Sequence, residues 1–128
     1  MSYRHPAREQ IRIEHVLTAL GNPVRLSAVR ILDGGGSHNC GSVLTAIGIT
    51  AKSTMTHHWR VLRDSGVIHQ QPSGRENLLR LRRDDLDARY PGLLDAVLSG
   101  AREDERQEER QEERQDEPHE ARRNPAAG

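Results

Sequence analysis

Polar and cationic side chains recur along one side of residues 50–66, a segment whose spacing predicts a short helix. Hydroxyls, an imidazole ring and positive charges can reach base edges and phosphates when a helix lies in a DNA major groove, which is about 12 Å wide. A surface helix of any small domain is the alternative, because polar outer faces are common. We interpret the segment as a DNA recognition helix at about residues 51–65. Its candidate DNA contacts are Lys52, Ser53, Thr54, Thr56, His57, Arg60 and Arg63.

The opposite side of this segment is predicted to face the protein core. Four residues at i, i+3, i+4 and i+7 share that face: Met55, His58, Trp59 and Leu62. We expect His58 to form a hydrogen bond within the motif and Trp59 to fill the core. At the two ends of the helix, Thr50 is expected to cap the first turn and Gly66 to end the last one in a left-handed conformation.

Three earlier helices are expected to position the recognition helix, over residues 13–20, 23–33 and 41–47. Gly21 stops the first of them, and Asn22 followed by Pro23 is a typical start for the second. A run of glycines at 34–36 separates the second helix from the third. A short turn containing glycine then joins the third helix to the recognition helix, which is the helix-turn-helix arrangement.

Two short strands are predicted after the recognition helix, over residues 67–71 and 77–81, with the turn between them at 72–75. A basic hairpin in this place, about residues 67–82, is a wing. Arg75 at its tip is a further candidate DNA contact, because an arginine there can enter the minor groove or pair with a phosphate. The alternative for Arg75 is a solvated turn residue.

The expected fold is therefore mainly α with a two-stranded β-wing, a winged helix-turn-helix. Residues 84–98 are predicted to form a last helix, interrupted at Pro91-Gly92. Together with the first helix it is the candidate interface of a homodimer. A two-fold dimer would place two recognition helices about 34 Å apart, one DNA turn, on a pseudo-palindromic operator.

Three parts of the chain are expected. Residues 1–10 are predicted to be a flexible segment, and residues 11–100 to be the DNA-binding and dimerisation domain. Residues 101–128 form a charged tail with a four-residue repeat and no apolar stripe, so we expect disorder rather than a coiled coil, with a transient extension of the last helix as the alternative. The tail is interpreted as a solubilising segment, with competition against DNA for the basic face as the alternative.

The distribution of charge favours a polyanionic partner. The whole chain has a net charge of zero, but residues 52–83 contain seven bases and two acids. A single cysteine excludes an intramolecular disulfide, and no segment resembles a signal peptide or approaches the ~20 apolar residues of a membrane helix. We therefore expect a cytoplasmic protein with no membrane partner. We find none of the sequence features that would indicate an enzyme: a nucleophile with its base, paired carboxylates or a glycine-rich phosphate loop. No catalytic residue is therefore assigned.

Two stretches in combination resemble the ArsR-type winged-helix repressors. Residues 20–26, LGNPVRL, resemble the LGNPxRL opening of that family. Residues 53–68, STMTHHWRVLRDSGVI, resemble its recognition helix, in which a hydroxyl-x-His step and the pattern xVLRxxGxV recur. Gly74-Arg75 matches the glycine-arginine of the wing. The likeness covers about residues 11–98 and implies a homodimeric repressor that an effector releases from its operator.

The resemblance also raises the question of metal sensing. Many members of the family bind metals through a Cys-x-Cys pair in the third helix, and the matching positions here are Cys40 and Ser42. A second common site uses histidine on the last helix, and residues 84–104 contain none. The remaining candidate ligands are scattered: His5, His15 and His38. We assign no metal site and no cofactor, expect Cys40 to be a small buried residue rather than a redox thiol, and leave the effector unidentified.

A winged-helix protein-interaction module that no longer contacts DNA is the alternative function. Such a module would hold its partner through the last helix and the charged tail. A complex that survives salt and nuclease in a pulldown would distinguish it from a DNA-binding protein. The excess of bases over residues 52–83 favours DNA binding.

Overall fold

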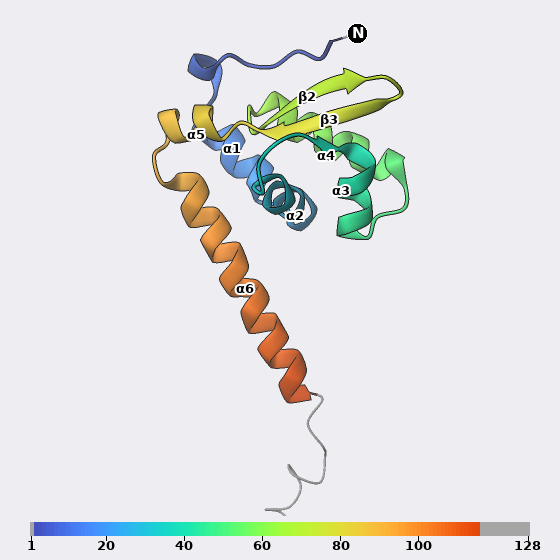
Figure 1. Cartoon of the computed structure of the whole chain (residues 1–128). Coiled ribbons are helices and arrows are strands. Elements are labelled where there is room, and N and C mark those ends of the chain that lie inside the picture. Colours follow the sequence, from blue (N-terminus) through green and yellow to red (C-terminus); the bar gives the residue numbers. More distant parts are fainter. Residues whose placement is uncertain (1, 116–128) are drawn as a thin grey trace, which may run out of the picture. The chain divides into compact units, whose positions relative to one another are not determined.

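The structure is a computed structural model that describes residues 2–115 of the 128-residue chain (Figure 1). The chain divides into two compact units, one ending at Leu94 and the other beginning at Asp95. In the described range, no helix has the length and apolar character needed to cross a membrane. The elements of the first unit are η1 (Arg8–Gln10), α1 (Ile13–Leu20), α2 (Pro23–Leu32), β1 (His38–Asn39), α3 (Cys40–Ile47), α4 (Lys52–Asp64), β2 (Ile68–Ser73), β3 (Glu76–Leu81) and α5 (Arg83–Arg89).

The junction of α1 and α2 follows the turn chemistry that the sequence predicts. Gly21 comes directly after the last residue of α1. The side chain of Asn22 then accepts hydrogen bonds from the backbone N–H groups of Val24 (2.9 Å) and Arg25 (3.2 Å). Because these N–H groups have no partner within the helix, the asparagine stabilises the first turn of α2.

The apolar side chains of α1 divide between the core and the surface. Val16 and Leu20 are buried, whereas Ile13 is 37% exposed and Leu17 is 50% exposed. Large apolar side chains on one exposed helix face are a feature of surfaces that bind another molecule.

Helices α3 and α4 form the predicted helix-turn-helix. Helix α3 begins one residue earlier than expected, since the side chain of Asn39 accepts a hydrogen bond from the N–H of Gly41 (2.7 Å). Gly48 ends the helix with a left-handed φ of +89°. The prediction that Thr50 caps α4 is wrong: the helix begins at Lys52, and the capping position holds Ala51, whose side chain has no acceptor.

Gly66 ends α4 as predicted, with a φ of +87°. The N–H of Val67 donates to the carbonyl of Leu62 (3.0 Å) across this turn. The glycine also lies against Ile11, and a Cβ at its position would be 2.6 Å from Cγ1 of that side chain. Both its backbone conformation and its surroundings therefore require glycine.

The wing belongs to a three-stranded antiparallel sheet in the order β1-β3-β2. Strands β2 and β3 form the predicted hairpin, with a tighter turn than the expected 72–75, because Ser73 pairs with Glu76 and only two residues lie between them. The short strand β1 pairs with β3 and was not predicted, since two polar residues after a glycine run carry no alternating pattern. The mainly helical winged fold is confirmed, with three strands rather than two.

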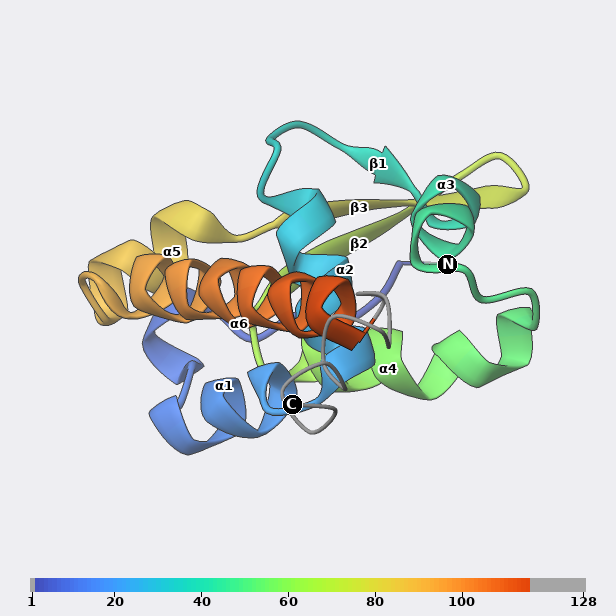
Figure 2. The same cartoon turned by 90° about the horizontal axis from the view of Figure 1, so that it is seen from below.

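Helices α2 and α3 pack against β3, and α1 and α2 pack against α4 (Figure 2). The core between them is largely aliphatic. Met55 and Trp59 of α4 are large core side chains that are not aliphatic. The burial of Trp59 agrees with its expected role as core filler. Fully buried side chains of this core include Ile11, Leu32, Leu62, Ile68 and Leu79.

Residues 2–10, which are predicted from the sequence to be flexible, pack against the rest of the first unit. The carbonyl of Pro6 accepts a hydrogen bond from Arg82 (2.7 Å), and Arg8 forms an ion pair with Asp85 (2.7 Å). The imidazole of His5 accepts a hydrogen bond from the N–H of Gln70 (2.9 Å). These contacts are polar and distant in sequence, so a hydropathy pattern cannot reveal them.

Helix α6 (Leu93–Gln115) begins after the predicted break at Pro91-Gly92 and continues past residue 101, where a disordered tail is predicted. Glu103 pairs with Arg106 (2.8 Å) and Arg110 (3.2 Å) along its surface. These pairs, together with the high helix propensity of Glu, Gln and Arg, support the extension. The predicted tail from 116 to 128 lies outside the described residues.

Candidate nucleic-acid interface

Six of the seven candidate DNA contacts on α4 are exposed together on the outer side of the helix. They are Lys52, Ser53, Thr54, Thr56, His57 and Arg60. The other side of α4 buries Met55, Trp59 and Leu62 in the core, so the helix cannot rotate without losing that burial. Its exposed side offers hydroxyls, one imidazole and two cations, a set that can bind phosphates and base edges.

Arg63, the seventh candidate, lies apart from the other six. Its side chain is 15% exposed and donates a hydrogen bond to Oε1 of Gln70 (2.7 Å) on β2. The guanidinium also lies over the ring of Tyr3, 4.5 Å from the ring centroid. Arg63 therefore connects α4 to the wing and to the N-terminal residues, and we assign it a structural role in place of the predicted DNA contact.

Arg75 lies at the turn of the hairpin, exposed as predicted. It shares one hollow of about 250 Å³ with Lys52, Thr56 and Trp59 of α4. The tip of the wing and the first half of the recognition helix are thus brought together, although they are separated by some twenty residues of sequence. Arg80 on β3 is exposed as well.

A buried arginine fixes α4 against α1 and α2. Arg25 of α2 donates to the carbonyls of Ala19 (2.8 Å) and Thr18 (3.1 Å), which belong to the last turn of α1. Its third contact is Nδ1 of His58 on α4, at 3.1 Å. A guanidinium has only donors, so Nδ1 of His58 must be the acceptor and carries no proton. Burial, followed by the charges of Arg25 and His57, lowers the pKa of His58 in agreement with that state.

A hydrogen bond of His58 within the motif was predicted from the sequence, but its partner Arg25 was not. A signal for Arg25 was present: it precedes Ala28, Val29 and Leu32 at i+3, i+4 and i+7, so it lies on the buried stripe of α2. An arginine on such a stripe indicates a partner for its charge inside the fold.

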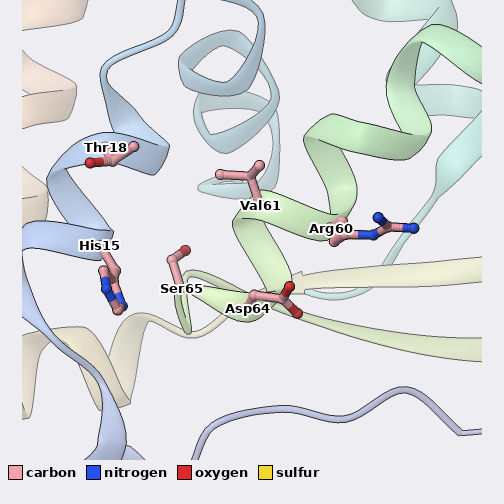
Figure 3. Close-up of a pocket in the computed structure, with 6 residues that line it drawn as sticks. All are labelled: His15, Thr18, Arg60, Val61, Asp64 and Ser65. Atoms are coloured by element: carbon pink, nitrogen blue, oxygen red, sulfur yellow. The ribbon is translucent and has the colours of Figure 1, made fainter.

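A second hollow, of about 360 Å³, lies where α1 meets the last turns of α4 (Figure 3). Val61 also lines it, and His15 and Thr18 of α1 lie across from Asp64, the last residue of α4, and from Ser65, which follows it. The hydroxyl of Thr18 donates to the carbonyl of Glu14 in α1, and that of Ser65 to the carbonyl of Leu62 in α4. The side chain of Arg60 points away from His15 and Thr18, so its guanidinium belongs to the outer side of α4.

Cys40 is half-buried at the start of α3. Burial, followed by the negative charge of Glu76, raises the pKa of its thiol to about 11. The thiol form therefore dominates at neutral pH, and thiolates are the form that binds metals and reacts with oxidants. Among residues 2–115, no group of three or more His, Cys, Asp and Glu side chains is arranged to hold a metal ion.

Comparisons with known proteins agree with this geometry. No family model matches the sequence. The chain is 30% identical over 90 residues to the uncharacterised HTH-type transcriptional regulator YceK of Bacillus subtilis (strain 168), a match that covers 70% of this chain and 88% of that protein. Among solved structures it is similar to the transcriptional repressor BigR of Xylella fastidiosa, with 28% identity and a TM-score of 0.55 over 68% of this chain and 83% of that one. It also shares the fold of an ArsR family transcriptional regulator, with 21% identity and a TM-score of 0.54 over 78% of this chain and 94% of that one.

Proposed function

Because this chain belongs to the ArsR-type winged helix-turn-helix transcriptional regulators, we propose that it represses transcription by binding a pseudo-palindromic operator as a homodimer. Transcriptional regulation is the activity that its relatives carry in their names. We place its action in the cytoplasm, on double-stranded DNA. An effector that releases the operator stays a prediction, and its chemistry is unidentified.

The observation that carries the proposal is the shared exposure of the recognition helix and the wing tip around one hollow. With α4 in a major groove, Lys52 can reach the phosphates beside it, and Arg75 can reach the neighbouring backbone or minor groove. We assign base contacts to Thr56, His57 and Arg60, which lie on the middle turns of the helix. Ser53 and Thr54 are assigned to the phosphates at its first turn.

The charge that supports binding is smaller than the sequence count indicates. Arg63, Arg82 and Arg83 all form hydrogen bonds within the fold. The exposed cations of this region are Lys52, Arg60, Arg75 and Arg80. If each neutralises one phosphate, a dimer has a log–log salt slope of about −7, from about 0.9 for each of four cations on each of two protomers.

The proposed dimer is supported by the uncovered apolar side chains of α1, Ile13 and Leu17. A second copy of the chain would remove them from water, with a gain of about 25 cal/mol for each Å² of apolar surface buried. Light scattering of the purified protein should give twice the mass of one chain. A mass equal to one chain at the concentrations that saturate DNA would refute the dimer.

The test of the function is an anisotropy titration of the protein against labelled DNA from its own upstream region, at about 50 mM and about 200 mM salt. We expect tight binding to this region, weaker binding to unrelated DNA, and a steep loss of affinity at the higher salt. Absence of selective binding at either salt would contradict the proposal and favour the protein-interaction module.

The contacts are tested with His57→Ala and Arg60→Ala, which remove exposed side chains that contribute nothing to the core. Each should weaken operator binding by about 10- to 100-fold, the range that loss of a good base contact produces, with unchanged folding by circular dichroism. Arg102→Ala removes an exposed arginine of α6 and serves as the control for charge alone. Unchanged affinity in both variants of α4 would refute the assignment of this side of the helix.

A further inference from the structure

The N-terminal strap, residues 2–7, lies along the outer side of β2 (Figure 1). Strand β2 is at the edge of the sheet, since the order is β1-β3-β2. The outward N–H of Gln70 would have no partner in the sheet, and it donates to Nε2 of His5 at 2.9 Å. Because this nitrogen accepts a hydrogen bond, it carries no proton in the folded strap.

The ring of His5 also stacks on the ring of His69, the neighbour of Gln70 on β2. The two ring centroids are 4.3 Å apart, and the planes differ by 11°. Two imidazoles at this separation stack favourably when both are neutral and repel each other when both are charged. The strap is thus held to the wing by a contact that depends on protonation.

The same strap reaches the recognition helix. The ring of Tyr3 lies under the guanidinium of Arg63, and Arg63 in turn donates to Oε1 of Gln70 (2.7 Å). The carbonyl of Pro6 accepts from Arg82, which follows β3. One short segment therefore contacts the last turn of α4 and both sides of the base of the wing. These are the two elements whose relative position determines whether helix and wing meet the same stretch of DNA.

The charges around the two rings are mostly positive. Arg63 on α4 and Arg82 after β3 face His5, and Arg80 on β3 and Arg82 face His69. The carboxylates next to these arginines are Asp64, 3.8 Å from Arg63, and Asp85, which pairs with Arg82 (2.9 Å). Burial and then the neighbouring charges lower the pKa of both His5 and His69.

We propose that His5 is a positioning residue for DNA binding: its neutral ring holds the wing and the recognition helix in one geometry, and proton uptake by the His5–His69 pair releases the strap and weakens binding to the operator. This inference rests on the proposed function. In the released state both rings are solvated and take up protons as the pH falls below about 6.5, their ordinary pKa. The attached strap resists protonation of these rings. The free energy that favours attachment is therefore fully present above that pH and is lost progressively below it.

The first experiment follows the strap without DNA, by NMR of the full chain between pH 5 and 8. We expect the ring signals of His5 and His69 to titrate below the ordinary imidazole pKa of about 6.5, and the amide signal of Gln70 to move with the midpoint of His5. An amide of Gln70 that does not respond when His5 titrates would overturn the inference. Because no DNA is present, this result is independent of the proposed function.

The second experiment measures operator affinity at pH 7.5 and pH 5.5 for the wild type and His5→Gln. Glutamine does not titrate, and its side-chain oxygen can still accept from the N–H of Gln70. Acidification can change DNA affinity through other groups as well, so the readout is the difference between the two proteins.

We expect acidification to weaken the wild type several-fold relative to His5→Gln, and the control His15→Gln to follow the wild type. Equal pH profiles of wild type and His5→Gln would overturn the inference. If neither protein bound DNA, the proposed function would fail while the NMR titration still decided the role of the strap.

Discussion

Replacement of Gly66 by alanine should destabilise the protein more than the same replacement at any open glycine turn. Gly66 has a φ of +87°, where a Cβ costs about 1–2 kcal/mol through its contact with the backbone. The new methyl would also stand 2.6 Å from Cγ1 and 2.8 Å from Cδ1 of Ile11. That side chain is 1% exposed and has little space to move, so overpacking adds about 1–3 kcal/mol. The expected total is a loss of about 2–5 kcal/mol.

Gly48 provides the matched control for Gly66→Ala. Its φ is +89°, almost the same, but nothing lies within 4 Å of a Cβ built on it. Gly48→Ala should therefore lose only the backbone contribution of about 1–2 kcal/mol. Urea denaturation of both variants at one protein concentration gives the two free energies of unfolding, and their difference measures the contact with Ile11.

A double variant tests the cause directly. Ile11→Ala removes the two atoms that the new methyl would meet, at its own cost of about 2–5 kcal/mol for a cavity. In that background, Gly66→Ala should lower the free energy of unfolding by no more than Gly48→Ala does in the wild type. The smaller loss would be measured as a coupling free energy between positions 11 and 66. Equal losses for the two single glycine variants, or additive effects in the double variant, would refute the packing argument and leave only the backbone conformation.

Two further predictions follow from titrating groups. The thiol of Cys40 has a pKa of about 11. At pH 7.5 it should therefore carry roughly 300-fold less thiolate than an ordinary cysteine with a pKa of about 8.5. Ellman's reagent reacts with the thiolate, so it should label the folded protein far more slowly than the urea-unfolded one. Rapid labelling of the folded protein would contradict this. The hydrogen bond from Arg8 and a further one from Arg82 lower the pKa of Asp85. Its ionised form therefore stabilises the fold at pH values above the ordinary carboxyl pKa of about 3.9. This stabilisation is lost as the pH falls through the lowered pKa. Asp85→Asn should cost about 1 kcal/mol at pH 7 in urea denaturation, and the difference from wild type should shrink as the pH falls below about 3.9. A difference that does not change with pH would exclude the ionised carboxylate as its cause.

Local patterns in the sequence were sufficient for much of the fold. Asn22 at the start of α2 and Gly66 at the end of α4 act through neighbouring backbone atoms, so their roles follow from residue type and position. The burial of Met55, Trp59 and Leu62 follows from helical spacing alone. The position of Arg75 at the wing tip follows from the turn residues around it.

What the sequence did not reveal depends on contacts between distant residues. The strap lies within residues 1–10, which were predicted to be flexible because they have no apolar pattern. Its hydrogen bonds reach partners more than sixty positions away. Arg63 looks like a DNA contact until Gln70 and Tyr3 are found beside it. Strand β1 is defined only by its pairing with β3. Such contacts carry no local periodicity, so propensity and spacing cannot predict them.

The outer edge of β2 has a consequence for association between molecules. An edge strand offers unpaired N–H groups to which a strand of another chain can add, and this is a common route to aggregation. Here the N–H of Gln70 already donates to His5. Pro72, two residues later, faces the same edge of the strand, and proline has no N–H. The imidazole and the proline therefore block the β-addition that would otherwise link wing to wing. Loss of the strap would expose one donor of this edge, so a chain shortened by residues 2–7 should be more prone to form β-rich aggregates than the full one.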